Sequence, residues 1–242
     1  MAGHSKWSNI KHRKGRQDAK KGKVFTKISK EIFAAVRSGG DDPDTNTKLR
    51  MALNKAKSAN MPNENIDRTI KKANGNIEGV SYEEITYEGY APHGIAVYVE
   101  ALTDNKNRTA AEVRLAFNKN NGNLGETGCV SFMFDRKGLL IIEVDENFDE
   151  EATLLKAIEA GAEDVSVSNE RAEIYTSPED FEEVKQQLES DGYNFIFSEV
   201  TMIPTTKTEL DEQTADEVFE LIDALEDNDD VQNVYHNLDI ES

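Results

Sequence analysis

The chain has 242 residues and a net charge of −19, from 47 acidic and 28 basic side chains. No run approaches the roughly 18 apolar residues of a membrane helix, and the N-terminus lacks the apolar segment of a signal peptide. An apolar fraction of 37% and a single cysteine, Cys129, are typical of a soluble, cytoplasmic protein with cores for one large or two to three small domains.

The charge is divided between the two ends of the chain. Residues 1–75 hold 18 basic and 7 acidic side chains, whereas residues 76–242 hold 10 basic and 40 acidic ones. The first thirty residues carry ten Lys or Arg against one acid, Asp18. We therefore expect the N-terminal part to bind a polyanion and the remainder to repel one.

Residues 1–22 contain three glycines and only two sizeable apolar groups, Trp7 and Ile10. Since no core can fix such a segment, it is predicted to be a basic flexible arm.

Residues 23–78 are predicted to form a three-helix domain. Apolar residues recur at three- and four-residue spacing from Val24 to Val36, and Gly39 and Gly40 end this first helix. Lys27 and Lys30 fall on its predicted solvent side. A second helix runs from Leu49 to Ala56, and a third is predicted to be capped by Asn63 and to end at Gly75.

From Gly79 onward, β-branched and aromatic residues indicate strands. We predict strands at 83–88, 94–102 and 129–134, with a helix at 107–121 and a glycine-rich loop at 122–128. Residues 138–203 show the order βαββαβ of a ferredoxin-like unit, with strands at 138–144, 164–167, 172–176 and 195–203 and helices at 150–160 and 178–190. A helix at 211–226 and a strand at 231–235 follow.

The predicted fold class is therefore α+β, with two ferredoxin-like α/β modules after the helical domain. Residues 79–137 plus 204–242 are expected to form one module, into which the domain 138–203 is inserted. A tandem arrangement is the alternative, but it would leave the C-terminal helix without a sheet to cover.

The basic arm is the main functional candidate. Its cations can neutralise several phosphates, and Trp7 and His12 can stack on bases. The alternative is a solubilising tail that Trp7 docks onto the helices. The predicted nucleic-acid contacts, which include the basic faces of the helices, are Lys6, Trp7, Lys11, His12, Arg13, Lys14, Arg16, Lys20, Lys21, Lys23, Lys27, Lys30, Arg50, Lys55, Arg68, Lys71 and Lys72.

Other motifs favour neither an enzyme nor a cofactor. The four histidines lack neighbours at metal-ligand spacing, and the glycines of the 122–128 loop fit a tight helix-to-strand connection. Cys129 is expected to be buried and inert at the start of a strand. The acidic run 226–230 is expected to be a solvated turn.

Four segments carry a resemblance to a known family: MAGHSKWSNIKHRKGRQDAKKGKVF, NMPNENIDRTIKKANG, YEGYAPHGIAVYVEALTDNKNRT and NGNLGETGCVSFMF. Together, in this order, they resemble the YebC/PmpR family. The resemblance implies a bacterial cytosolic protein with a helical N-terminal domain and two α/β domains. The chain departs from the family at Ala91 and His93, where glycines are expected, and at Arg16, where a small residue is expected.

The resemblance implies one of two functions. Members are usually described as probable transcriptional regulators that bind DNA, and residues 60–63 could be the turn of a weakly indicated helix-turn-helix. Relatives include a mitochondrial translational activator, which implies a ribosome-associated factor whose arm binds ribosomal RNA. The charge pattern favours the second slightly, because an acidic body is repelled by a long duplex, whereas a narrow arm can enter an RNA crevice. A module that binds only proteins would not need the arm, and a basic protein is the expected partner of the acidic modules.

Overall fold

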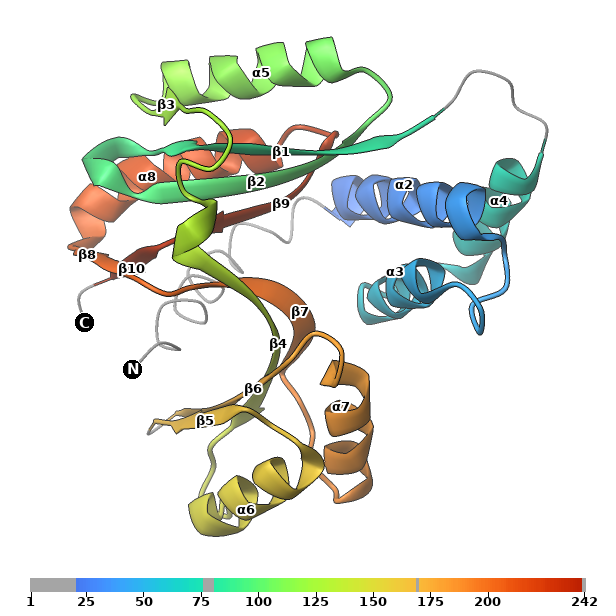
Figure 1. Cartoon of the computed structure of the whole chain (residues 1–242), viewed down its shortest axis with the longest axis vertical. Coiled ribbons are helices and arrows are strands. Elements are labelled where there is room, and N and C mark those ends of the chain that lie inside the picture. The colour runs from blue at the N-terminus through green and yellow to red at the C-terminus, as the bar shows by residue number, and fades with distance from the viewer. Residues whose placement is uncertain (1–20, 76–80, 169, 241–242) are drawn as a thin grey trace. The chain divides into compact units, whose positions relative to one another are not determined.

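The structure is a computed structural model. It describes residues 21–75, 81–168 and 170–240. It is an α+β protein, as predicted, with a helical segment followed by two antiparallel-sheet modules (Figure 1). The described residues divide into two compact units: 132–209 with 237–239, and the remainder. None of the helices in the described ranges is long and apolar enough to cross a membrane.

The helical segment consists of α2 (Lys21–Gly39), α3 (Thr47–Ser58) and α4 (Asn63–Asn74). Helix α2 packs against both other helices. The core of the segment includes Ile32 of α2 and Leu49 of α3, which are fully buried. Buried Asn46 fixes the turn between α2 and α3, since its side chain donates to Ala35 O and Gly40 O and accepts from Leu49 N.

The start of α4 differs from the prediction. The residue at the N-cap position is Pro62, and it makes no side-chain cap; Asn63, the predicted cap, is the first residue of the helix. Proline at this boundary loses no helical hydrogen bond, because the first amides of a helix have no partner within it.

The first sheet has the strand order β3-β1-β2-β9 and is antiparallel throughout. Its elements are β1 (Glu83–Tyr90), β2 (Ala96–Thr103), α5 (Lys106–Lys119), β3 (Asn123–Leu124), α8 (Glu212–Glu226) and β9 (Val231–His236). Helices α5 and α8 pack against each other and against this sheet. Strand β9 therefore returns from the end of the chain to pair with β2.

Between β3 and α8 lies the segment with βαββαβ order. It contains β4 (Phe134–Glu143), α6 (Glu150–Ala160), β5 (Asp164–Val167), β6 (Arg171–Thr176), α7 (Phe181–Ser190) and β7 (Phe197–Pro204). Its strand order is β5-β6-β4-β7, with every pair antiparallel. Two short strands that the sequence did not predict, β8 (Thr208–Leu210) and β10 (Leu238–Ile240), form a separate two-stranded sheet.

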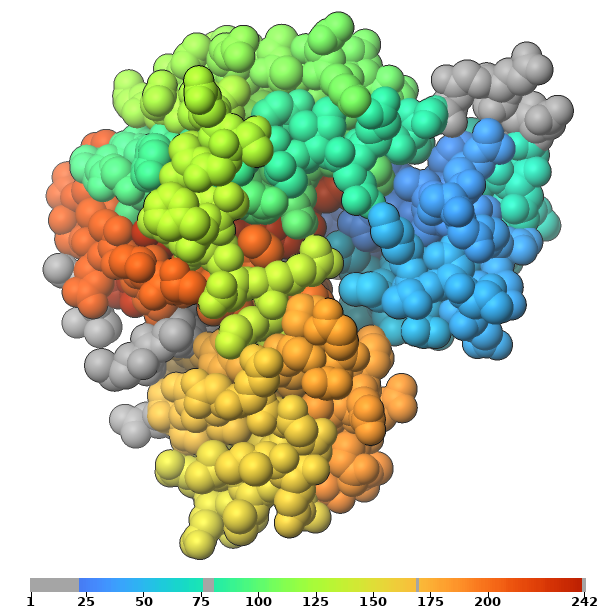
Figure 2. All heavy atoms as spheres, viewed as in Figure 1, coloured from blue at the N-terminus to red at the C-terminus, as the bar shows by residue number. Residues whose placement is uncertain are grey.

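The strand predicted at 129–134 is wrong, and a buried carboxylate gives the reason. Glu88 is only 3% exposed and accepts hydrogen bonds from Gly128 N (2.8 Å), Val130 N (2.8 Å) and Ser131 N (2.7 Å). These bonds curl the chain around the side chain, so that Ser131–Met133 form a 3₁₀ turn and β4 begins only at Phe134. In the space-filling view the yellow-green loop lies directly against the teal strand residues (Figure 2).

Two glycines of this region occupy positions where a side chain would be strained or would collide with its neighbours. Gly128 adopts a φ of 92°, in the left-handed region, just where its amide turns toward Glu88. A β-carbon on Gly89 would collide with the backbone of Asn123 and the ring of Phe117. The absence of a side chain at Gly89 therefore allows β3, within the glycine loop, to pair with β1.

His93, one of the departures from the family pattern, occupies a backbone position that favours glycine. Its φ is 63°, and Gly94 follows with a φ of 75°. The left-handed conformation costs a residue with a β-carbon about 1–2 kcal/mol. The ring bonds Glu217 of α8, at 3.0 Å between Nε2 and Oε2, and this contact offsets part of the cost.

We predict that Glu88→Gln destabilises the protein. Burial raises the pKa of Glu88, but the hydrogen bonds from the three amides outweigh burial and lower it, so the side chain is a carboxylate at neutral pH. Glutamine replaces one acceptor oxygen with a donor that faces an amide. We expect the free energy of unfolding to fall by roughly 1.5–3 kcal/mol in urea titrations, with faster amide exchange in residues 124–133.

The matched control is Glu84→Gln on the same strand. Glu84 is exposed and pairs with exposed Lys48, so the change should be below about 0.5 kcal/mol. Equal effects of the two substitutions would contradict the assigned role of Glu88.

Candidate nucleic-acid interface

The predicted nucleic-acid contacts fall into three groups in the structure. Those of the arm, from Lys6 to Lys20, lie outside the described residues. Lys21 begins α2. The remaining residues lie on α2, α3 and α4, and their surroundings differ sharply.

Three of the lysines of α2, Lys23, Lys27 and Lys30, form one row and contact the C-terminal end of α8 and the turn that follows it. Lys23 Nζ lies 3.0 Å from the carbonyl oxygen of Asp227, and Lys27 Nζ lies 2.7 Å from that of Glu226. Lys30 Nζ donates to Asp229 O (2.8 Å) and to a carboxylate oxygen of Asp230 (2.6 Å). The last carbonyls of a helix carry partial negative charge, so cations stabilise this end.

The prediction that Lys27 and Lys30 face solvent is therefore wrong. The side chain of Lys30 is only 15% exposed, and that of Lys27 donates to a distant part of the chain. The helical pattern of α2 placed its apolar residues correctly, but it carries no information about an acidic partner some two hundred residues away.

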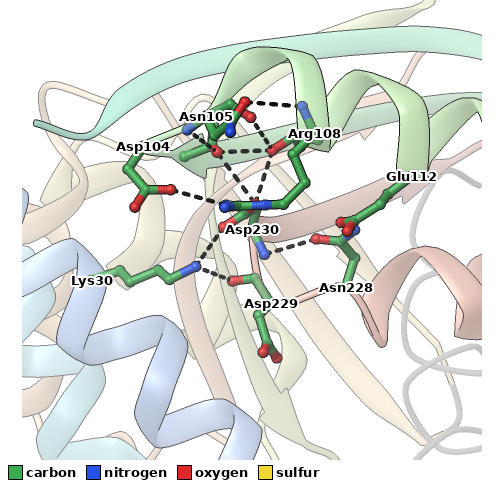
Figure 3. Close-up of polar contacts among 10 residues, drawn as sticks. Lys30, Asp104, Asn105, Arg108, Glu112, Asn228, Asp229 and Asp230 are labelled. Carbon is green, nitrogen blue, oxygen red and sulfur yellow. Dashed lines mark hydrogen bonds and ion pairs between the residues drawn. The ribbon is translucent and has the colours of Figure 1, made fainter.

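Asp230 is the centre of this contact (Figure 3). It is 3% exposed, and one oxygen pairs with Lys30 while the other accepts from Arg108 (2.6 Å) and from the hydroxyl of Thr109 (2.8 Å). Burial alone would raise the pKa of Asp230, but the hydrogen bonds from Lys30, Arg108 and Thr109 outweigh it and lower the pKa to about 2. Asp230 therefore stays ionised and joins α2, α5 and β9.

The sequence did not reveal this cluster. The run 226–230 was expected to be a solvated turn, yet Asp230 is among the most buried polar residues. The only local signal is at Asn105, which caps α5 by accepting from Arg108 N at 3.1 Å and so fixes the start of the helix that supplies Arg108 and Thr109.

The basic residues of α3 and α4 are less engaged. Lys55 pairs with Glu31 of α2 (2.9 Å), and the guanidinium of Arg50 lies 3.4 Å from Pro43 O. Among the residues that the structure describes, the side chains of Arg68, Lys71 and Lys72 on α4 have no ion-pair partner, and all three are exposed. Of the predicted helix contacts, those on α4 have the freest charge.

The described residues offer little for catalysis or metal binding. They include no group of three His, Cys, Asp or Glu side chains that could hold a metal ion. Cys129 is half-buried rather than fully buried, and burial, followed by the nearby charge of Glu88, raises the pKa of its thiol. A raised pKa leaves less of the reactive thiolate.

These features define an α+β protein in which a basic helical segment precedes two acidic sheet modules. The chain belongs to the TACO1/YebC family: residues 5–76 match the model of the N-terminal domain, and residues 82–238 match that of the second and third domains.

Several relatives are similar over nearly their full length. A "probable transcriptional regulatory protein" of Geobacillus kaustophilus is 60% identical over 240 residues, which is 99% of this chain and 98% of the relative. One of Natranaerobius thermophilus is 56% identical over 243 residues, covering 100% and 97%. The crystal structure of a conserved hypothetical protein, Aq1575 of Aquifex aeolicus, has a TM-score of 0.79 at 49% identity and covers 93% of both chains.

We predict that Asp230→Asn destabilises the protein in a pH-dependent manner. The folded pKa is lower than the usual 3.8, so the carboxylate stabilises the fold above about pH 4, and this contribution is lost as the pH falls toward 2. The shift corresponds to about 2 kcal/mol at pH 7. In urea titrations at several pH values, the difference in the free energy of unfolding between wild type and variant should shrink as the pH falls.

Asp227→Asn is the control, because its carboxylate is 49% exposed and pairs with an exposed lysine. A difference for Asp230→Asn that stays constant from pH 7 to pH 2 would show that ionisation of Asp230 does not stabilise the fold.

Proposed function

We propose that this protein is a regulatory nucleic-acid-binding protein, a transcriptional regulator that contacts DNA through its N-terminal arm and the free basic face of α4. The observation that carries the proposal is the charge division: residues 1–75 hold 18 basic and 7 acidic side chains in a chain of net charge −19. Relatives named as probable transcriptional regulatory proteins support the regulatory role.

Contacts within the chain narrow the set of cations that we propose for the interaction. Lys23, Lys27 and Lys30 are bound to carbonyl and carboxylate oxygens of the same chain, so a phosphate would have to compete for them. Arg68, Lys71 and Lys72 need no such exchange. We therefore assign the interaction to the arm together with α4.

A second candidate is a translation factor that binds ribosomal RNA, and the charge of the rest of the chain favours it. Residues 76–242 hold 40 acidic and 10 basic side chains. A long duplex would bring its phosphates close to these acids, whereas a folded RNA can admit the basic end alone.

Other parts of the proposal follow from the same residues. We propose a non-enzymatic role in the cytoplasm without a cofactor, and the raised pKa of the Cys129 thiol, which disfavours the reactive thiolate, supports the first part. A basic protein is the partner whose charge complements the acidic modules.

We predict that removing residues 1–20 abolishes most of the nucleic-acid affinity. If about five arm charges neutralise phosphates, a log–log plot of affinity against salt should have a slope of about −4 to −5 for the full chain and a much shallower slope for the truncated chain. Fluorescence anisotropy with labelled duplex DNA and structured RNA measures both.

The truncated chain begins at Lys21, the first residue of α2, and keeps every described helix and strand. Circular dichroism should therefore show an unchanged melting temperature. Unchanged affinity after truncation would refute the role of the arm.

An experiment in cells can distinguish the DNA-binding function from the RNA-binding one. Gradient fractionation followed by crosslinking and sequencing should recover promoter DNA if the protein regulates transcription. Recovery of ribosomal RNA alone would reject the transcriptional role and support the second candidate.

A further inference from the structure

The helical segment contains an open groove next to the free cations of α4. Its cavity volume is about 310 Å³, and it lies between α2 and the start of α4. It is lined by Phe25 and Ser29 of α2, by Met61, and by Asn65, Arg68 and Thr69 of α4. This volume is at the lower end of the roughly 300–1,000 Å³ of small-ligand sites, which suits one flat group.

The groove combines an apolar floor with polar side chains at its rim. Met61 and Phe25 both line the groove with apolar atoms; Met61 is 5% exposed, and Phe25 is half-buried against the helical core. Among described residues, the side chains of Ser29 and Asn65 have no hydrogen-bond partner. The hydroxyl of Thr69 is occupied, since it donates to Asn65 O at 2.8 Å.

The cations continue from the groove along one face of α4. Residues 65, 68, 69 and 72 are spaced by three and four positions, so Asn65, Arg68 and Lys72 lie in one row. An amide at the groove is thus followed by a guanidinium and an ammonium group.

This order matches the chemical parts of a nucleotide. The base of a nucleotide has a face that stacks on aromatic or apolar side chains and an edge that bonds an amide, and the phosphate of the nucleotide bonds a guanidinium. A base within a duplex is stacked and paired, and it enters such a groove only after the energy of unstacking is supplied.

We propose that this groove binds an unpaired nucleotide, with the base against Met61 and Phe25, its edge at Asn65 and its phosphate at Arg68. The proposal rests on the proposed nucleic-acid-binding function and specifies its ligand as a single-stranded segment, whether of RNA or of opened DNA. The alternative hypothesis is that α3 and α4 form a helix-turn-helix, which would bind duplex DNA rather than an unpaired nucleotide.

The test uses the full chain and three labelled probes of one sequence, about 12 nucleotides long: single-stranded RNA, single-stranded DNA and duplex DNA. Asn65→Leu should weaken single-strand binding about tenfold, because the base edge loses its partner. The salt slope should stay unchanged, since no phosphate contact is lost, and duplex binding should not change.

Two further variants separate the groove from general charge. Asn74→Leu, the same substitution at the exposed end of α4, removes only a surface hydrogen bond to Asp41 and should leave all three affinities unchanged. Lys72→Gln should instead make the single-strand salt slope less steep by about 0.7. Thermal melting checks that each variant folds.

A photoreactive base in the single-stranded probe gives a test on the wild-type protein. Crosslinks to peptides that contain Phe25 or Met61 would support the proposal, and the probe with the higher yield identifies RNA or DNA as the source. Crosslinks confined to the arm would overturn it.

The outcomes distinguish the groove from the general function. If wild type binds with steep salt dependence and Asn65→Leu binds equally well, the groove proposal fails and the function stands. An equal loss on single strands and duplex would also overturn the groove proposal, in favour of duplex recognition. If wild type binds none of the probes, both proposals fail.

Discussion

The attraction between the lysine row of α2 and the C-terminal end of α8 fixes the helical segment against the first sheet module. Lys23, Lys27 and Lys30 are spaced four and three residues apart, so they lie along one side of the helix. Their partners are carbonyls at a helix end and the buried carboxylate of Asp230. The contact combines an interaction with the helix dipole and a desolvated ion pair. The hydrogen bonds of all three lysines together determine its geometry.

This contact also determines which cations are available. The sequence shows a basic end and an acidic remainder, and such a chain can satisfy its charges internally as well as with a polyanion. The structure shows that α2 does the former. Helix α4 keeps three exposed cations without an ion-pair partner among the described residues, Arg68, Lys71 and Lys72, and Arg68 also lines the groove. Internal pairing therefore leaves fewer free cations in this part of the chain than its composition suggests.

The sequence was a good guide wherever local patterns determine structure. Helix α6 and strand β5 have the predicted bounds, because Asp149 caps the helix and Gly161 ends it in a left-handed conformation. The prediction was wrong where contacts between residues far apart in the sequence determine the local structure. Glu88 draws three amides some forty residues away out of a strand, and strands as short as β3 depend on their pairing partner rather than on propensity.

The same reason explains why the Asp230 cluster was missed. A count of charges identifies the lysines, but the burial of Asp230 depends on Lys30, 200 residues away, and on Arg108, 122 residues away. Topology brings them together. Because β9 must return to pair with β2, the turn after α8 is placed beside the start of α5, and Leu102 N donates to Asp230 O at 2.8 Å. The pairing of β9 with β2 thus positions the acid that holds α2, so the strand that completes the first sheet also determines which lysines of the helical segment are bound within the chain.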